Sequence, residues 1–228
     1  MKSFAVIGLG RFGQKLAIAL TMSDADVIAI DRDRAIIDTI RDQVTHAVRL
    51  DSTDEEALRA QGIDKVDVAI VGIGQGGQAF EAAVLTVVNL KHIGVKQIYA
   101  RAQSLTSGQV LESVGADEVI YPEIESAQRW AYRLIAPQIS DRIDFAPGYS
   151  LARIKAPPSF DGKTIMDLQL RQKYNVNLVA IKRAENREIK KSRKDQIINV
   201  PMPDTVIYHD DILLVAGSDS DLAKLPQE

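Results

Sequence analysis

The sequence contains no cysteine. This absence excludes disulfides, thiolate nucleophiles and cysteine-based zinc sites, and it is typical of proteins in a reducing compartment. Long apolar runs are missing too, because none approaches the ~18 residues of a membrane-spanning helix. The first residues have the pattern of a strand and not of a signal peptide. We therefore expect a soluble, cytoplasmic protein.

The chain also lacks an excess of either charge. It carries 28 basic and 31 acidic residues, a net charge of −3, which gives no general attraction to nucleic acids or anionic membranes. Residues 182–194 do hold seven basic residues against two acidic ones. No aromatic residue is interleaved there for base stacking, so we favour a solvated loop over a nucleic-acid surface. We expect no nucleic-acid partner.

A glycine motif follows the first apolar run. Residues 4–7 are apolar, and Gly8, Gly10 and Gly13 follow in the pattern Gly-x-Gly-x-x-Gly before a helix expected over 14–22. This context is typical of nucleotide-binding folds, because the glycines allow close approach of a diphosphate and the helix N-terminus stabilises its charge. We expect phosphates near residues 10–13.

The second apolar run, 27–30, ends in Asp31. Such folds place a ribose-binding carboxylate about 20 residues beyond the glycine motif. Asp31 would accept hydrogen bonds from both ribose hydroxyls and repel a 2′-phosphate, so we expect an adenosine nucleotide without that phosphate. Arg32 would favour the phosphate, but Asp31 and Asp33 flank it. The alternative role of Asp31 is to cap a helix over 34–42.

The first 122 residues alternate short apolar runs with amphipathic segments. We expect strands over 3–8, 27–31, 46–51, 68–73, 97–101 and 118–121. This alternation predicts an α/β fold with a Rossmann-like, doubly wound parallel sheet. We expect Thr53 to cap a helix through Arg59 that ends at Gly62. A second glycine-rich loop, 72–77, precedes a helix over 78–93. Loops after strands one to four meet in such folds, so one site should include Gly10, Asp31, Asp51 and Gly74.

The pattern changes after Pro122. We expect a helix over 125–135, breaks at Pro137 and at the turn of Pro147 and Gly148, and then a small α+β lobe. That lobe should contain strands over 151–154, 178–182 and 212–216, a helix over 164–172 and a last helix. The predicted domains are a nucleotide-binding lobe, 1–123, a crossover helix and hinge, 124–148, and a C-terminal lobe, 149–228. An apolar face formed by Trp130, Leu134 and Ile135 predicts self-association.

Catalytic machinery is hard to find. A dehydrogenase needs a proton-transfer group facing the nicotinamide, and the only histidines are His46, His92 and His209. His209, beside Asp210 and Asp211, could bind a metal, but we favour a solvent-exposed turn. The sequence therefore points to sensing and not to an enzyme, with an NAD-dependent oxidoreductase as the alternative.

Several motifs resemble one known family. Segments 4–13, 45–48, 111–117 and 122–123, followed by 162–168 and 179–183, are similar to the Ktr/Trk-type cytoplasmic regulatory subunits of bacterial potassium uptake. These are RCK proteins, regulators of potassium conductance, and the resemblance covers essentially the whole chain. It implies an octameric ring, peripheral to the inner face of the membrane, that docks on a potassium-translocating membrane subunit. ATP and ADP would favour different ring shapes, with NAD or NADH as alternative ligands.

The resemblance also implies roles for single residues. Arg11 would contact the distal phosphates, Arg101 would lie near the phosphates, and Asp51 and Gly74 would lie near the base. Glu123 matches a position linked to divalent cations such as Mg²⁺ or Ca²⁺, with a plain surface glutamate as the alternative. The complete expected nucleotide site is Gly8, Gly10, Arg11, Phe12, Gly13, Asp31, Arg32, Asp51, Ser52, Gly72, Ile73, Gly74 and Arg101.

Some relatives bind cyclic di-AMP between paired C-terminal lobes, near the equivalents of Ile165, Asp167, Leu168 and Arg171. Arg171 could hold a phosphate, but we favour an ordinary helix-surface arginine. The sequence departs from the family pattern at two places. Asn175 replaces a glycine and can still adopt a left-handed turn. Asp210 and Asp211 stand where a glycine–aspartate pair is usual.

Overall fold

A computed structural model describes residues 2–74, 77–136, 139–183 and 196–226. The chain forms two compact units, Met1–Ser126 and Ala127–Glu228. Within the described residues, no helix combines the length and the apolar character needed to cross a membrane.

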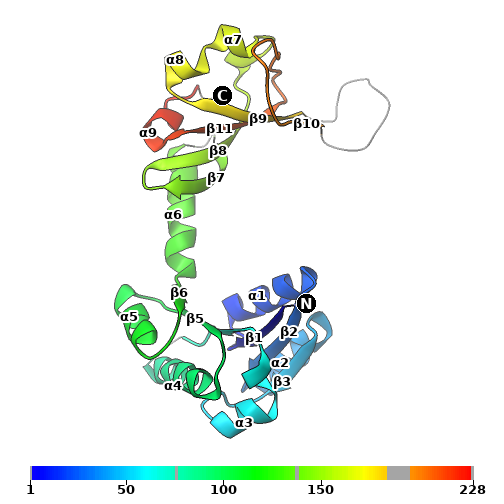
Figure 1. Ribbon diagram of the computed structural model, residues 1–228, viewed down its shortest axis with the longest axis vertical. Coiled ribbons are helices and arrows are strands. Elements are labelled where there is room, and N and C mark those ends of the chain that lie inside the picture. Colours follow the sequence, from blue (N-terminus) through cyan, green and yellow to red (C-terminus); the bar gives the residue numbers. More distant parts are fainter. Residues whose placement is uncertain (1, 75–76, 137–138, 184–195, 227–228) are drawn as a thin grey trace. The chain divides into compact units, whose positions relative to one another are not determined.

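The first unit contains a parallel six-stranded sheet (Figure 1). Its spatial order is β3-β2-β1-β4-β5-β6, so the strand order reverses between β1 and β4, as in a doubly wound fold. This confirms the predicted fold class. The strands are β1 (Ser3–Ile7), β2 (Asp26–Asp31), β3 (His46–Arg49), β4 (Val68–Val71), β5 (Gln97–Arg101) and β6 (Glu118–Ile120).

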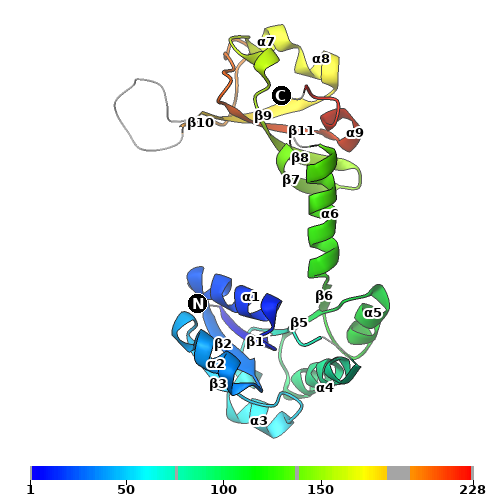
Figure 2. The ribbon, with the colours of Figure 1, turned by 180° about the vertical axis from the view of Figure 1, so that it is seen from behind.

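Helices cover both faces of this sheet because successive apolar side chains of each strand point to opposite sides. Val6, Ala29 and Ile70 pack with α1 (Arg11–Met22) and α2 (Arg34–Ile40), which lie together over β1 to β3 in Figure 2. Ile7, Ile30 and Val71 belong to the core on the other face. That face is covered by α3 (Glu55–Ala60), α4 (Gly77–Ile93) and α5 (Leu105–Ser113), with a short 3₁₀ turn at Ile63–Lys65. Another 3₁₀ turn, Arg41–Gln43, follows α2.

The turn from β1 into α1 requires two of its glycines. Gly8 has φ +88°, a conformation that side chains disfavour. A Cβ on Gly13 would lie 2.1 Å from the carbonyl oxygen of Gly8. These two glycines therefore allow the close packing of strand and helix that brings the start of α1 to the end of β1.

The second unit is built on an antiparallel sheet of order β10-β9-β11-β8-β7. Ile154, Ile181 and Leu213 of its central strands are fully buried, and short helices cover this core. Helix α6 (Pro122–Ile135) begins in the first unit and ends in the second. The elements are β7 (Ile139–Ala146), β8 (Tyr149–Lys155), β9 (Asn177–Arg183), β10 (Gln196–Ile198) and β11 (Ile212–Ser218), with a 3₁₀ turn at Pro158–Phe160 and helices α7 (Ile165–Leu168), α8 (Leu170–Tyr174) and α9 (Asp219–Leu222).

Several local predictions were wrong. The cap of α3 is Asp54, whose side chain accepts a hydrogen bond from Ala57, whereas Thr53 bonds to Asp51. Helix α6 begins at Pro122, because proline suits the first position of a helix. The helix expected over 164–172 is two helices separated by Gln169, with φ 48°.

Strands β7 and β10 were not expected from the sequence. Asn175 does adopt the predicted left-handed conformation, with φ 55°. Pro137 lies outside the described residues, as do residues 75–76 of the second glycine loop and most of the basic segment 182–194.

Candidate functional site

A cavity of about 1110 Å³ lies at the carboxyl ends of the parallel strands. Register explains its composition, because Ile30, Ile7, Val71 and Ala100 lie side by side on four neighbouring strands. The residue that follows each of these, namely Asp31, Gly8, Gly72 and Arg101, therefore lies at the same carboxyl edge of the sheet. The cavity is lined by these predicted residues: Gly8, Gly10, Arg11, Phe12, Asp31, Arg32, Asp51, Ser52, Gly72, Ile73, Gly74, Arg101 and Glu123.

Gly13 is the one predicted residue that is not part of the cavity lining. It is buried in α1 against the backbone of Gly8. Its effect on a ligand is therefore indirect, through the position of the helix.

The N-terminus of α1 opens into the cavity. Gly10 is its N-cap, and no side chain in the described part of the protein caps the helix. An ideal Cβ built on Gly10 would have nothing within 4 Å, so a side chain here would occupy cavity space. Free backbone N–H groups and the helix dipole favour an anion at such a position. Arg11 and Lys15, one turn apart on α1, add two positive charges to the lining.

Asp31 holds the glycine loop from the end of β2. Its Oδ2 accepts a hydrogen bond from the backbone N–H of Leu9 at 2.7 Å, and its Oδ1 accepts one from Asp33 at 2.9 Å. The cap of α2 is Asp33, whose Oδ1 accepts from the backbone of Ala35 at 2.8 Å. The capping alternative for Asp31 is therefore wrong.

The loop after β3 is fixed by α4. The hydroxyls of Ser52 and Thr86 lie 2.7 Å apart, and the Asn89 amide donates to the Ser52 and Thr53 carbonyls at 3.3 and 2.9 Å. Asp51 accepts from the side chain and the backbone of Thr53 at 2.7 and 3.0 Å. These bonds, aided by the charge of Arg32, lower the pKa of Asp51.

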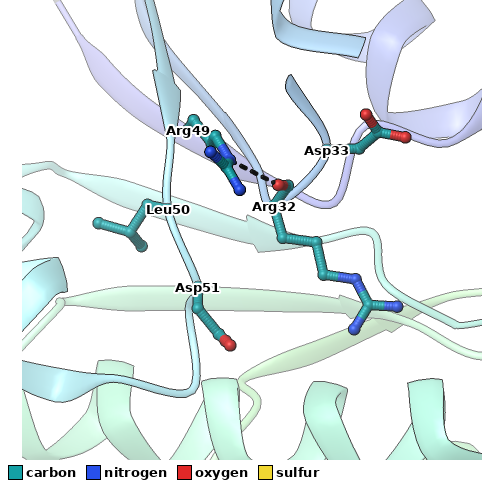
Figure 3. A pocket seen from close by; sticks show the side chains of 5 residues that line it. All are labelled: Arg32, Asp33, Arg49, Leu50 and Asp51. Carbon is teal, nitrogen blue, oxygen red and sulfur yellow. Dashed lines mark hydrogen bonds between the residues drawn. The ribbon is translucent and has the colours of Figure 1, made fainter. Parts of the chain in front are cut away.

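A second hollow of about 640 Å³ adjoins the cavity (Figure 3). It is lined by Arg32, Asp33, Arg49, Leu50 and Asp51, and it shares Arg32, Leu50 and Asp51 with the cavity. The Arg49 Nε donates to the Arg32 carbonyl oxygen at 3.1 Å, drawn as a dashed line in Figure 3. The two hollows together give this edge of the sheet room for a ligand that extends past Asp31.

Arg101 and Glu123 form an ion pair at the other end of the cavity. Arg101 ends β5 and Glu123 lies in the first turn of α6. Burial raises the pKa of Glu123, but hydrogen bonds from its own backbone N–H and from Arg101 outweigh it, so the net pKa lies below the ordinary value.

The polar lining residues that were not predicted from the sequence are Lys15, Thr53, Gln78 and Glu81. Lys15 could have been predicted from the sequence, because it lies four residues after Arg11 and therefore on the same face of the helix that starts at the glycine loop. Gln78 and Glu81 lie at the start of α4, after the second glycine loop. That helix follows β4, so its first turn faces the same crevice as α1.

Neither histidine of the first unit, His46 or His92, is among the residues that line the cavity. His92 Nδ1 is 3.5 Å from Glu55, and His209 Nε2 is 2.9 Å from Asp210. Among the described residues, no group of three or more histidine or acidic side chains is arranged to hold a metal ion. His209 and Asp210 are exposed, as expected of a turn, whereas Asp211 is buried.

Two domain families match the chain: the TrkA-N domain over residues 4–122 and the TrkA-C domain over residues 150–226. The chain belongs to the Ktr/Trk family of potassium-uptake regulatory proteins. This confirms the family resemblance. The sheet topology likewise confirms the predicted Rossmann-like lobe and the smaller C-terminal lobe.

Two relatives in this family come from Bacillus subtilis (strain 168). Ktr system potassium uptake protein C is 36% identical over 98% of this chain and 95% of its own length. Ktr system potassium uptake protein A is 32% identical over 100% of this chain and 96% of its own length. The Ktr/Trk likeness therefore extends over both units.

Solved RCK structures share the fold. The crystal structure of the GsuK RCK domain superposes with a TM-score of 0.60 and 17% identity, covering 98% of this chain and 46% of that one. The structure described as the GsuK channel bound to NAD gives 0.58 and 16%, covering 97% and 38%. At this level of identity the likeness establishes the fold alone.

In the second unit, the residues predicted near a cyclic di-AMP site differ in their burial and in their hydrogen bonds. Asp167 forms a capping box with Thr164, whose hydroxyl donates to it at 2.6 Å, and this bond lowers the pKa of Asp167. Leu168 is buried in the core, whereas Arg171 is exposed. The Asp167 carboxylate is thus hydrogen-bonded in the capping box of α7. Cyclic di-AMP binding stays a prediction.

Proposed function

We propose that this Ktr/Trk-family protein is a non-enzymatic sensor that binds ATP or ADP and gates a membrane subunit that passes potassium. One observation carries the proposal: the uncapped start of α1, with open space at Gly10, lies in the same cavity as Asp31. This juxtaposition suits a ligand with an anionic group and a ribose, since helix N-termini favour phosphates and a carboxylate accepts from hydroxyls.

Each part of an adenine nucleotide has a counterpart in the lining. The diphosphate would lie at Gly10 and Phe12, the ribose at Asp31, and the base on the side of Asp51, Ser52 and Gly74. Gly8, Gly72 and Ile73 would form the floor. Arg11 and Arg101 would contact the outer phosphates, because a guanidinium presents paired donors to phosphate oxygens.

Glu123 is the proposed ligand for Mg²⁺ or Ca²⁺ near the phosphates. A single carboxylate is a weak site for either ion, so phosphate oxygens or a second subunit would have to complete the coordination shell.

Self-association is the second part of the proposal. On α6, Trp130, Leu134 and Ile135 are 53%, 77% and 75% exposed. An exposed apolar set on one helix is typical of a subunit contact. We propose a homo-oligomer, in the form of an octameric ring, that docks on the inner face of the membrane through a potassium-translocating partner.

NAD or NADH is the alternative ligand, and an NAD-dependent oxidoreductase is the alternative function. The observation that favours sensing is that neither histidine of the first unit, His46 or His92, lines the cavity, although histidine is the commonest proton-transfer group.

The test combines binding with transport. We expect calorimetry to give binding of ATP and ADP that is tighter than binding of NADH. Potassium flux through liposomes with the reconstituted partner should follow the ATP/ADP ratio. Binding of NADH alone, with hydride transfer to an added substrate, would overturn the proposal. Flux that ignores the ratio while both nucleotides bind would remove gating and leave the binding site intact.

A further inference from the structure

Arg101 is a buried cation at the edge of the cavity. It is 8% exposed at the end of β5. Register places it level with Gly8 and Gly72, because the residues before these three pair across β1, β4 and β5. Burying a charge is costly unless paired and hydrogen-bonded, so the partners of Arg101 are informative.

These partners are incomplete. A guanidinium carries five N–H donors, and the Nη2 of Arg101 donates to a Glu123 carboxylate oxygen. The Nε of Arg101 is buried and has no hydrogen-bond partner among the described residues. An unsatisfied donor on a buried cation is unfavourable. The site therefore favours an anion with more acceptor oxygens than Glu123 supplies.

Glu123 does not depend on Arg101 to stay ionised. Its side chain is 62% exposed, and it lies in the first turn of α6. Water and the helix N-terminus both stabilise a carboxylate there. Glu123 can therefore lose Arg101 at little cost. Arg101 is buried and has no other ion-pair partner among the described residues, so it cannot lose Glu123 without a replacement.

We propose that the phosphates of a bound nucleotide replace Glu123 as the partner of Arg101. This inference rests on the proposed function and adds a partner exchange to it. A diphosphate offers several oxygens, so the guanidinium can satisfy its Nε and Nη donors together. The exchange releases the Glu123 carboxylate.

This exchange gives the ligand a direct effect on α6. Glu123 is in the first turn of the helix, and the helix continues into the second unit. Nucleotide phosphates thus change the charge environment at the start of that helix, whereas adenosine, which has no phosphate, leaves the ion pair intact.

The test is calorimetric titration of the full chain with ADP and with adenosine, in buffer with EDTA so that no cation bridges carboxylate and phosphate. The variants are Glu123→Gln, Arg101→Gln and the double variant. Glu125→Gln is the matched control, because Glu125 lies in the same helical turn but is not in the cavity lining.

Glu123→Gln should bind ADP about tenfold more tightly than the wild type, since Arg101 no longer has to leave a charged partner, a change of about 1.4 kcal/mol. Adenosine affinity should not change, and Glu125→Gln should match the wild type. In the Arg101→Gln background the gain should disappear.

An unchanged or weaker ADP affinity in Glu123→Gln would overturn the exchange, and so would an equal gain for adenosine or a gain that persists without Arg101. The single variant at exposed Glu123 decides this even if Arg101→Gln folds poorly. Failure of the wild type itself to bind ADP is a distinct result, which overturns the proposed function and this inference together.

Discussion

The carboxylate of Asp31 accepts a hydrogen bond from the backbone N–H of Leu9 at 2.7 Å, so the residue expected to bind the ribose also holds the glycine loop. Its other oxygen accepts from the backbone of Asp33 at 2.9 Å. Each carboxylate oxygen has two lone pairs, so both keep acceptor capacity for a ribose hydroxyl. Asp31 therefore has a structural role and a proposed binding role that mutagenesis can separate.

Asp31→Ala should weaken both stability and nucleotide binding. Loss of the bond to Leu9 should lower the free energy of unfolding by about 1–2 kcal/mol, and loss of two charge-assisted bonds to the ribose should weaken ADP binding by about 1.5–3 kcal/mol. The control is Asp54→Ala, which removes the cap of α3 but lies outside the cavity lining. Denaturant titration and calorimetry measure the two effects. Equal ADP affinity in both variants would remove Asp31 from the ribose site.

Gly10→Ala should weaken ADP binding, whereas Gly13→Ala should lower stability. A Cβ at Gly10 meets no protein atom within 4 Å, so this variant should fold normally and bind ADP at least about tenfold more weakly because the methyl group crowds the phosphates. A Cβ at Gly13 lies 2.1 Å from the Gly8 carbonyl, so that variant should lose about 1–3 kcal/mol of stability. Thermal melts with and without ADP would test the pair. A Gly10→Ala protein with unchanged ADP affinity would place the phosphates elsewhere.

Arg11→Ala should reduce ATP affinity more than ADP affinity, by about 1–2 kcal/mol, because only ATP offers a terminal phosphate. Arg34→Ala is a suitable control, since the Arg34 side chain is 79% exposed and is not part of the cavity lining. Calorimetry with both nucleotides gives the difference directly. Equal losses for ATP and ADP would assign Arg11 to the shared phosphates or to the ring surface.

The sequence predicted the parallel sheet because its central strands β1, β2 and β4 are mainly apolar runs. The antiparallel unit was harder to predict. Strand β7 is mostly exposed, with polar residues along much of Ile139–Ala146, so it has little apolar pattern. The break between α7 and α8 depends on Gln169 in a left-handed conformation, where no glycine gives a signal.

The positions of the predicted site residues followed from the same logic, because loops at the carboxyl ends of parallel strands converge. The pairing of Arg101 with Glu123 could not be predicted this way. It joins residues from neighbouring elements of different type, and the burial that makes it informative depends on three-dimensional packing. Likewise, the capping alternative for Asp31 could be decided only by the hydrogen bonds of Asp33.

Stability should fall in acid. Asp67 accepts hydrogen bonds from the backbone and hydroxyl of Ser3 at 2.9 and 3.0 Å, and these bonds lower its pKa in the folded state. The unfolded chain therefore binds more protons in this range, so the contribution of Asp67 is present above the usual carboxyl pKa of about 4 and is lost as the pH falls below it.

Asp67→Asn should consequently lower the melting temperature at neutral pH, and its difference from the wild type should shrink below about pH 4. Exposed Asp204→Asn serves as the control, expected to follow the wild type throughout. Thermal melts across this pH range measure the three proteins. A difference that stays constant with pH would show that the bonds to Ser3 do not depend on the charge of Asp67.

The exposed apolar residues of α6 should mediate self-association. Leu134 and Ile135 are 77% and 75% exposed, and a contact between subunits would bury them. Leu134→Glu should therefore shift the native mass from an oligomer toward the 25.1 kDa monomer, because the contact would have to bury a charge. Gln128→Glu adds the same charge to the same helix at an exposed polar position and should leave the assembly intact. Sedimentation with ADP present gives both masses. A wild-type protein that sediments as a stable monomer would contradict the assembly, and with it the proposal that nucleotides act by favouring different arrangements of one oligomer.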